Sequence, residues 1–116
     1  MIFYGQTDER NYPEDVFKLR REVQQARGII LGTPEYHGSL SGALKNALDL
    51  MSFDELGGKM IGLVGISGGS MGAVNALNSL RNIGRNLSVT EAFYPKTRTD
   101  AAYANIPLNF FHVVCY

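Results

Sequence analysis

The chain has 116 residues, enough for one domain and too few for two. Hydrophobic residues make up 45%, so a buried core is expected and disorder is not. Lys and Arg number 11, as do Asp and Glu, which argues against a nucleic-acid or anionic-membrane binder because both need a basic excess. The single Cys115 excludes an internal disulfide, and neither a signal peptide nor a membrane span is recognisable, so a cytoplasmic protein is expected.

The first third of the chain reads as strand, loop, helix and strand. Residues 1–4 are apolar and predict a short strand, and a polar loop follows to Pro13. Acidic residues just after this proline indicate a helix start, so we predict a helix over 14–26 that ends at Gly28. Its apolar side chains recur every three or four residues, namely Val16, Leu19, Val23 and Ala26. The apolar run 28–32 predicts a buried strand.

Two further helices and a second apolar run follow. Ser39 or Ser41 is a suitable N-cap for a helix over 42–51. The buried stripe expected for this helix is Leu44, Ala47, Leu48 and Met51. Residues 53–58 read as a connection. Residues 60–66 form an apolar run without alternation, as expected for a strand with helices on both faces of its sheet. A helix from about 71 to 85 then carries Ala73, Leu77, Leu80 and Ile83 on one side.

The C-terminal part is less regular. Residues 87–93 and 109–116 are strand candidates, and the stretch 95–100 is polar. Alternating strands and helices with right-handed crossovers predict an α/β fold with a parallel, doubly wound sheet. We treat residues 1–116 as a single domain, with 88–116 as a tail of uncertain structure.

Two loops at predicted strand ends are the candidate ligand-binding segments. Residues 33–42 and 65–72 are rich in small residues, and each leads into a helix. Such loops present backbone N–H groups and the positive end of a helix dipole, which suit a phosphate or an electron-rich ring. Tyr36 and His37 could border an aromatic ring. On spacing alone, each loop is also compatible with an ordinary strand-to-helix turn, the second loop more so than the first.

Other motifs are weak or absent. Neither the Rossmann fingerprint nor the P-loop spacing occurs. Gly65-Ile66-Ser67-Gly68-Gly69 formally matches the nucleophile elbow of serine hydrolases, with His112 as the sole downstream histidine, and we keep this as a remote alternative. His37 and His112 are too few and too far apart to predict a metal site.

The first loop and its helix closely resemble the NADPH-dependent FMN reductase family, which has a flavodoxin-like three-layer fold and a TPEYNGS…LKNALD signature. The matching stretches are Thr33-Pro34-Glu35-Tyr36-His37-Gly38-Ser39 and Gly42-Ala43-Leu44-Lys45-Asn46-Ala47-Leu48-Asp49. The resemblance continues through the second loop and covers roughly residues 10–87. His37 stands where the family usually has asparagine.

The resemblance implies two cofactors, FMN and NADPH. It implies that NADPH passes a hydride to the flavin, which passes electrons to a quinone, a flavin, an azo dye or a metal oxyanion, with no catalytic acid or base. It assigns FMN binding to ten residues, which are Thr33, Pro34, Glu35, Tyr36, His37, Gly38, Ser39, Ser67, Gly68 and Gly69. The implied partners are NAD(P)H, a small electron acceptor, and copies of the chain in a homodimer or tetramer, with no nucleic acid and no membrane.

The chain departs from the family pattern at both ends. Family members begin with a strand and a loop that binds the FMN phosphate, and we recognise neither here. In a sheet of order 2-1-3-4-5 that strand lies beside the third, which here is 28–32. Either residues 1–4 or another chain would then fill the gap. We therefore hypothesise an N-terminally shortened product with an altered tail. The alternative function is a non-catalytic fragment that binds no FMN and at most associates with full-length subunits.

Overall fold

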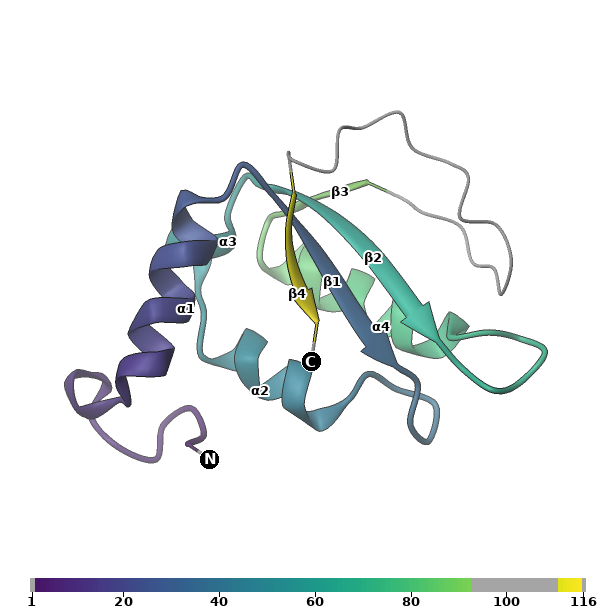
Figure 1. Ribbon diagram of the computed structural model, residues 1–116, viewed down its shortest axis with the longest axis horizontal. Helices are drawn as coiled ribbons and strands as arrows, with labels where there is room; N and C mark the ends of the chain where they lie inside the picture. Colours follow the sequence, from purple (N-terminus) through teal and green to yellow (C-terminus); the bar gives the residue numbers. More distant parts are fainter. Residues whose placement is uncertain (1, 93–110, 116) are drawn as a thin grey trace.

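A computed structural model describes residues 2–92 and 111–115 of the chain. Strands and helices alternate along most of it, and the strands form one sheet (Figure 1). The elements are η1 (Glu9–Asn11), α1 (Glu14–Gln25), β1 (Gly28–Pro34), α2 (Gly42–Asp49), α3 (Phe53–Leu56), β2 (Met60–Ile66), α4 (Val74–Asn86), β3 (Thr90–Ala92) and β4 (Phe111–Cys115).

The sheet is parallel throughout, with the order β3-β2-β1-β4. The register between β1 and β2 runs from Gly28 opposite Met60 to Pro34 opposite Ile66, so the two strands end at the same level. Because the strands are parallel, the segments that leave β1 and β2 emerge at one edge of the sheet. This edge carries both loops that the sequence singled out.

The core lies on one face of the sheet. Successive strand residues point to opposite faces, and alternate residues of β1 and β2 are buried in a single cluster with side chains from α1, α2, α3 and α4. The strand members of this cluster are Ile29, Leu31, Ile61 and Leu63. On the opposite face, Val64 and Ile66 are exposed. The described helices therefore cover one face, and the described residues supply two of the three layers expected for a flavodoxin-like fold.

The predicted helices are confirmed with small shifts at their ends. Helix α1 begins at Glu14 as expected, and the predicted apolar stripe of α2 is buried. Ser41, not Ser39, caps α2, because its hydroxyl accepts the N–H of Leu44 at 3.2 Å. Helix α4 begins at Val74 instead of residue 71, since a turn over residues 70–73 contains Gly72 at φ +61°.

The short helix α3 was missed by the sequence prediction, which gave residues 53–58 as a connection. A capping box starts it: the Ser52 hydroxyl accepts the N–H of Asp54, and the Glu55 carboxylate accepts the N–H of Ser52 at 2.7 Å. The Ser-x-x-Glu pattern of a capping box was present in the sequence. Leu56, at the end of α3, is fully buried in the core.

The predicted strand over residues 1–4 is wrong for the residues described. Residues 2 and 3 have no regular secondary structure and Tyr4 lies in a turn, which Phe3 and Gln6 close through two hydrogen bonds. Next in the chain, Asp8 caps η1, and the side-chain hydrogen bond from Arg10 lowers the pKa of this exposed carboxyl. This segment therefore lies outside the sheet.

The sheet position beside β1 is filled by β4, from the C-terminal end of the chain. Gly28 pairs with Phe111, and Gly32 pairs with Cys115, in parallel register. The two occupants considered from the sequence, residues 1–4 and a second chain, are both wrong. The strand candidates near the C-terminus are confirmed as the shorter strands β3 and β4. The polar stretch 95–100 lies outside the described residues.

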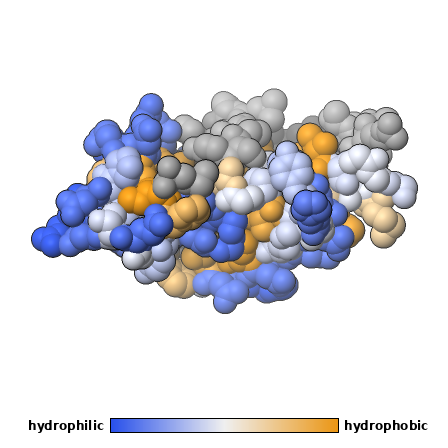
Figure 2. Space-filling model, turned by 90° about the horizontal axis from the view of Figure 1, so that it is seen from below, coloured by the Kyte–Doolittle hydropathy of each residue, from blue (hydrophilic) through white to orange (hydrophobic). Residues whose placement is uncertain are grey.

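The helical side of the molecule has a groove of about 640 Å³ between α2, α4 and the N-terminal turn. It is lined by a mixture of apolar and polar side chains that includes Tyr4, Lys45 and Asn86. Seen from below the view of Figure 1, the apolar surface forms separate orange areas between hydrophilic ones (Figure 2). Of the helices in the described residues, none combines the length and apolar character that a membrane crossing requires.

Candidate functional site

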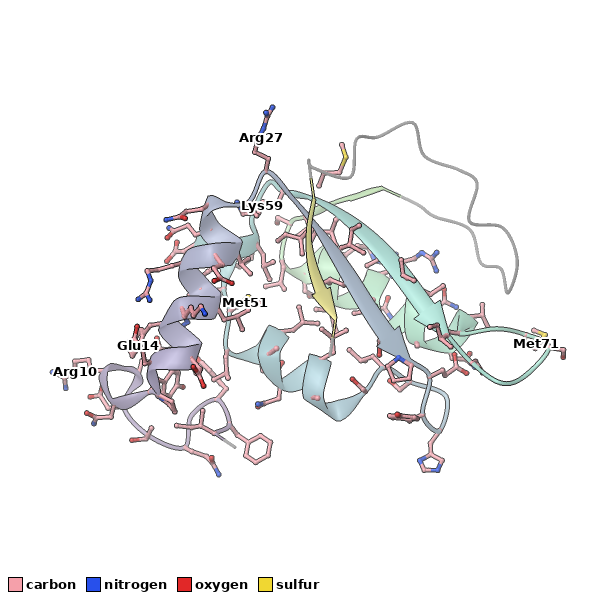
Figure 3. The ribbon with its side chains drawn as sticks, viewed as in Figure 1. Arg10, Glu14, Arg27, Met51, Lys59 and Met71 are labelled. Atoms are coloured by element: carbon pink, nitrogen blue, oxygen red, sulfur yellow. The ribbon has the colours of Figure 1, made fainter. Side chains whose placement is uncertain are left out.

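The two loops singled out by the sequence lie together at the carboxyl edge of the sheet. Figure 3 shows Met71 at the outer tip of the loop between β2 and α4, and it shows Arg27 and Lys59 at the opposite end of the strands. Carboxyl ends of parallel strands are where open α/β folds bind ligands. The candidate site therefore consists of the first loop, residues 35–41, and the second loop, residues 67–73, together with the strand residues that precede them.

The first loop is anchored at its base by Thr33, which is 4% exposed. Its hydroxyl donates to the carbonyl of Pro34 at 2.8 Å and accepts the N–H of Ser41 at 2.9 Å. The loop thus closes on its own strand just before α2 begins. Thr33 was predicted to bind the cofactor, and the structure places its side chain inside the protein as a support for the loop.

A tight turn forms the tip of the first loop. Tyr36 and Ser39 exchange two backbone hydrogen bonds of 3.0 and 3.1 Å around His37 and Gly38. Both central residues have positive φ, +50° and +77°, as a type I′ turn requires. Asparagine and histidine are among the few non-glycine residues enriched in this conformation, so histidine can replace the family's usual asparagine without breaking the turn. Tyr36 is 62% exposed beside it.

The second loop makes few internal contacts. The N–H of Gly69 donates to the Ser67 hydroxyl at 3.3 Å, and the N–H of Gly72 donates to the Gly69 carbonyl at 3.2 Å. A side-chain carbon added at Gly68 would meet no atom within 4 Å, so this part of the loop is open on that side. Ile66, which precedes the loop, and Met71 within it are 73% and 66% exposed.

Glu35 connects the two loops. Its backbone N–H donates to the Ile66 carbonyl at 2.8 Å, and its carboxylate accepts the backbone N–H groups of Asn75 and Ala76, each at 3.0 Å. Ser39 adds a weaker contact, with its hydroxyl 3.4 Å from that of Ser79 on α4. The ten predicted site residues are thus brought to one edge, although the side chains of Thr33 and Glu35 are occupied by protein contacts.

The exposed groups at this edge combine hydrogen-bond donors with apolar surface. Among the described residues, the backbone N–H groups of His37, Gly38 and Gly68 have no hydrogen-bond partner, so they are free to donate to a ligand. Tyr36 and Ile66 offer apolar surface next to these donors. Polar backbone donors beside apolar side chains are typical of small-molecule binding sites.

Sequence reasoning missed Asn75 at this edge and gave Ile66 and Met71 no place among the site residues. Ile66 and Met71 were counted in the second loop, residues 65–72, but not among the ten site residues, and Asn75 was not singled out at all. The uniformly apolar run of β2 gave no alternation that would mark Ile66; the structure exposes it, whereas Ile61 and Leu63 are buried on the other face. No local signal marked Asn75, whose role depends on Glu35.

The serine hydrolase alternative is contradicted by the strand register. His112 pairs with Ile29, which pairs with Ile61, near the start of β2. Ser67 follows the end of that strand, so the two residues lie about 20 Å apart at roughly 3.3 Å per residue. Catalytic contact is therefore impossible. No cluster of three or more metal-ligating side chains occurs in the part of the chain that the structure describes.

Comparison with known proteins identifies the family. A sequence model of the family described as NADPH-dependent FMN reductase matches residues 2–95. The chain belongs to this family. The match extends beyond residues 10–87, where the resemblance was recognised in the sequence, and includes both candidate loops.

Curated relatives that match the chain include bacterial azoreductases. An NADPH azoreductase from Bacillus sp. (strain OY1-2) is 44% identical over 63 residues, which are 54% of this chain and 35% of the relative. An FMN-dependent NADPH-azoreductase from Staphylococcus aureus (strain USA300) is 50% identical over 46 residues, 40% of this chain and 24% of the relative. The chain therefore matches about a third or less of the length of these two relatives.

Two solved structures share the fold. FerB, a flavoenzyme NAD(P)H:(acceptor) oxidoreductase from Paracoccus denitrificans, superimposes with a TM-score of 0.73 at 26% identity, over 84% of this chain and 56% of FerB. An oxidoreductase from Corynebacterium diphtheriae gives a TM-score of 0.65 at 17% identity, over 72% of this chain and 48% of that one. These similarities confirm the flavodoxin-like α/β fold.

Proposed function

We propose that this chain binds the isoalloxazine ring of FMN between the first and second loops and takes part in NAD(P)H-dependent flavin reduction. The observation that carries the proposal is the pair of loops tied together at the carboxyl edge of two adjacent parallel strands, with free N–H groups and exposed apolar side chains. Family membership and the names of the azoreductase relatives support it.

In this proposal the chain itself provides binding and orientation. The N–H groups of His37, Gly38 and Gly68 donate to the polar edge of the ring, and Tyr36 and Ile66 flank its faces. When bound, FMN supplies the hydride acceptor and passes electrons onward. We propose a quinone, a flavin or an azo compound as electron acceptor, in line with the azoreductase names of the relatives.

Titration with two flavins tests the ring-binding proposal. FMN and riboflavin differ by the phosphate, and the described loops are proposed to contact only the ring. We expect both flavins to bind with affinities within about 10-fold, whereas a phosphate site with charge-assisted bonds of roughly 1.5–3 kcal/mol each would favour FMN far more. A shifted visible spectrum and quenched flavin fluorescence report binding. No binding of either flavin at tens of micromolar would contradict the proposal.

A matched pair of tyrosine variants locates the site. Tyr36 in the first loop is 62% exposed, and Tyr4 in the N-terminal turn is 66% exposed. We expect Tyr36→Ala to weaken flavin binding about 10-fold, since an aromatic pair contributes about 0.5–1.5 kcal/mol beyond its buried area. Tyr4→Ala removes an equally exposed ring that lines the groove between α2 and α4, outside both loops, and should leave affinity unchanged.

The second candidate function is a reductase-derived chain that binds no FMN and associates with full-length subunits. The placement of β4 favours it, because β4 occupies the position in which the family resemblance places the first strand and its phosphate loop. Mixing the chain with a full-length homologue and measuring the mass of the complex tests this candidate. Flavin binding by the chain alone would contradict it.

A further inference from the structure

Glu35 binds both ends of the second loop from outside it. Its backbone N–H donates to the carbonyl of Ile66, the residue just before the loop, at 2.8 Å. Its carboxylate accepts the N–H groups of Asn75 and Ala76, just after the loop, at 3.0 Å each, and the Asn75 side-chain amide lies at 3.4 Å. A single residue of the first loop therefore sets where the second loop leaves β2 and where it enters α4.

Helix α4 has no cap from its own sequence neighbour. Ala73 occupies the N-cap position and makes no side-chain capping bond, whereas Ser41 and Ser52 cap α2 and α3. The Glu35 carboxylate takes this role from 40 and 41 residues away in the sequence. A carboxylate is well suited to it, because the N–H groups and the helix dipole both favour a negative charge there.

This capping contact gives Glu35 a different role from a ring contact. The second loop has few internal hydrogen bonds and is rich in glycine, so its position depends on how its ends are held. We propose that Glu35 is a positioning residue: by capping α4 it holds the second loop against the first in the arrangement that binds the flavin ring. This inference rests on the proposed function, but the capping contact itself can be tested without a ligand.

The test compares two changes at Glu35 with one change at Glu55. Glu35→Ala removes the oxygen acceptor, and Glu35→Gln keeps an oxygen in the same place without the charge. Glu55→Ala is the matched control, since this carboxylate also accepts a backbone N–H at a helix start, in α3, which packs against α1. Amide hydrogen exchange and flavin titration are measured for all three variants and the unaltered chain.

We expect hydrogen exchange at Asn75 and Ala76 to be at least about 10-fold faster in Glu35→Ala, less than about 3-fold faster in Glu35→Gln, and unchanged in Glu55→Ala. If the unaltered chain binds flavin, affinity should fall about 10-fold in Glu35→Ala and recover in Glu35→Gln. Unchanged exchange in Glu35→Ala would overturn the capping role even if no flavin binds.

The flavin measurements separate positioning from direct contact. An equal loss of flavin affinity in Glu35→Gln and Glu35→Ala, with exchange at Ala76 preserved in Glu35→Gln, would mean that the charge itself acts on the ring and would overturn the proposal. If Glu35→Ala does not fold, Glu35→Gln and the unaltered chain still test the capping role. In the unaltered chain, the N–H groups of Asn75 and Ala76 must then be better protected from exchange than the N–H of Val74. Failure of all variants to bind flavin would instead count against the proposed function.

Discussion

The two loops at the carboxyl edge of the sheet are held in opposite ways. The first loop is fixed internally, by the type I′ turn at His37-Gly38 and by the buried hydroxyl of Thr33 at its base. The second loop has two weak internal contacts and is fixed mainly at its ends, through Glu35. A loop with its own hydrogen bonds thus serves as the support for a glycine-rich neighbour.

This difference suggests how the edge is organised for a ligand. A pre-formed loop reduces the ordering cost of binding, and an open loop held at its ends can approach a flat ring closely. The comparison predicts that substitutions that break the hydrogen bonds or the turn of the first loop lower stability, whereas substitutions in the middle of the second loop leave it almost unaltered. Four sets of variants test this, from the largest expected effect to the smallest.

Gly65→Ala should have the largest effect, because it would force β2 and α4 apart just before the second loop begins. A side-chain carbon at Gly65 would lie 2.5 Å from the Cβ atom of Ala73 and 3.3 Å from Leu77 on α4. Relieving this overlap must move α4 away from β2, at a cost of about 3 kcal/mol in the free energy of unfolding. Urea denaturation followed by circular dichroism measures it. A loss below about 1 kcal/mol would mean that α4 adapts easily.

Thr33→Val should break the first loop at its base. The substitution keeps the size of the side chain but removes the oxygen that accepts the N–H of Ser41, leaving a buried donor without a partner. We expect unfolding to become easier by about 2 kcal/mol. Thr33→Ser keeps the acceptor and is the control. Equal stability of the Val and Ser variants would show that this hydrogen bond does not hold the loop.

Two glycine substitutions compare the loops directly. Gly38 has φ +77°, so Gly38→Ala should cost about 1 kcal/mol. Gly68 has open space around it and no positive φ, so Gly68→Ala should be neutral or stabilise by up to about 1 kcal/mol through the unfolded chain. The difference between their urea midpoints is the measurement. Equal effects would contradict the contrast drawn between the two loops.

His37→Asn should have the smallest effect and tests the meaning of the histidine. Asparagine before glycine is the preferred pair for a type I′ turn, so we expect a gain of about 0.5 kcal/mol or less in stability. Flavin affinity should be unchanged, because the proposed donor is the backbone N–H of this residue. A clear fall in affinity would show that the imidazole contacts the ligand.

Much of this fold was readable from local sequence. Strand β2 was predicted with the bounds observed, and the stripe of α2 was identified by its spacing, because periodicity reports directly which side of an element is buried. The recognition of the flavin reductase signature was confirmed by the family match. The capping box at Ser52 was equally local and could have been read in the same way.

Contacts between distant parts of the chain were decided only by tertiary structure. The free edge of β1 needs a strand that supplies partners for its backbone groups, and in the structure β4 supplies them. In the sequence, the apolar residues at both ends of the chain were suitable for this position. The described helices lie on one face of the sheet because the connections between the strands cross over on that face. The sequence showed that Glu35 lies in the first loop, but only folding brought it to the start of α4, some 40 residues away, where the unpaired N–H groups of the helix needed an acceptor.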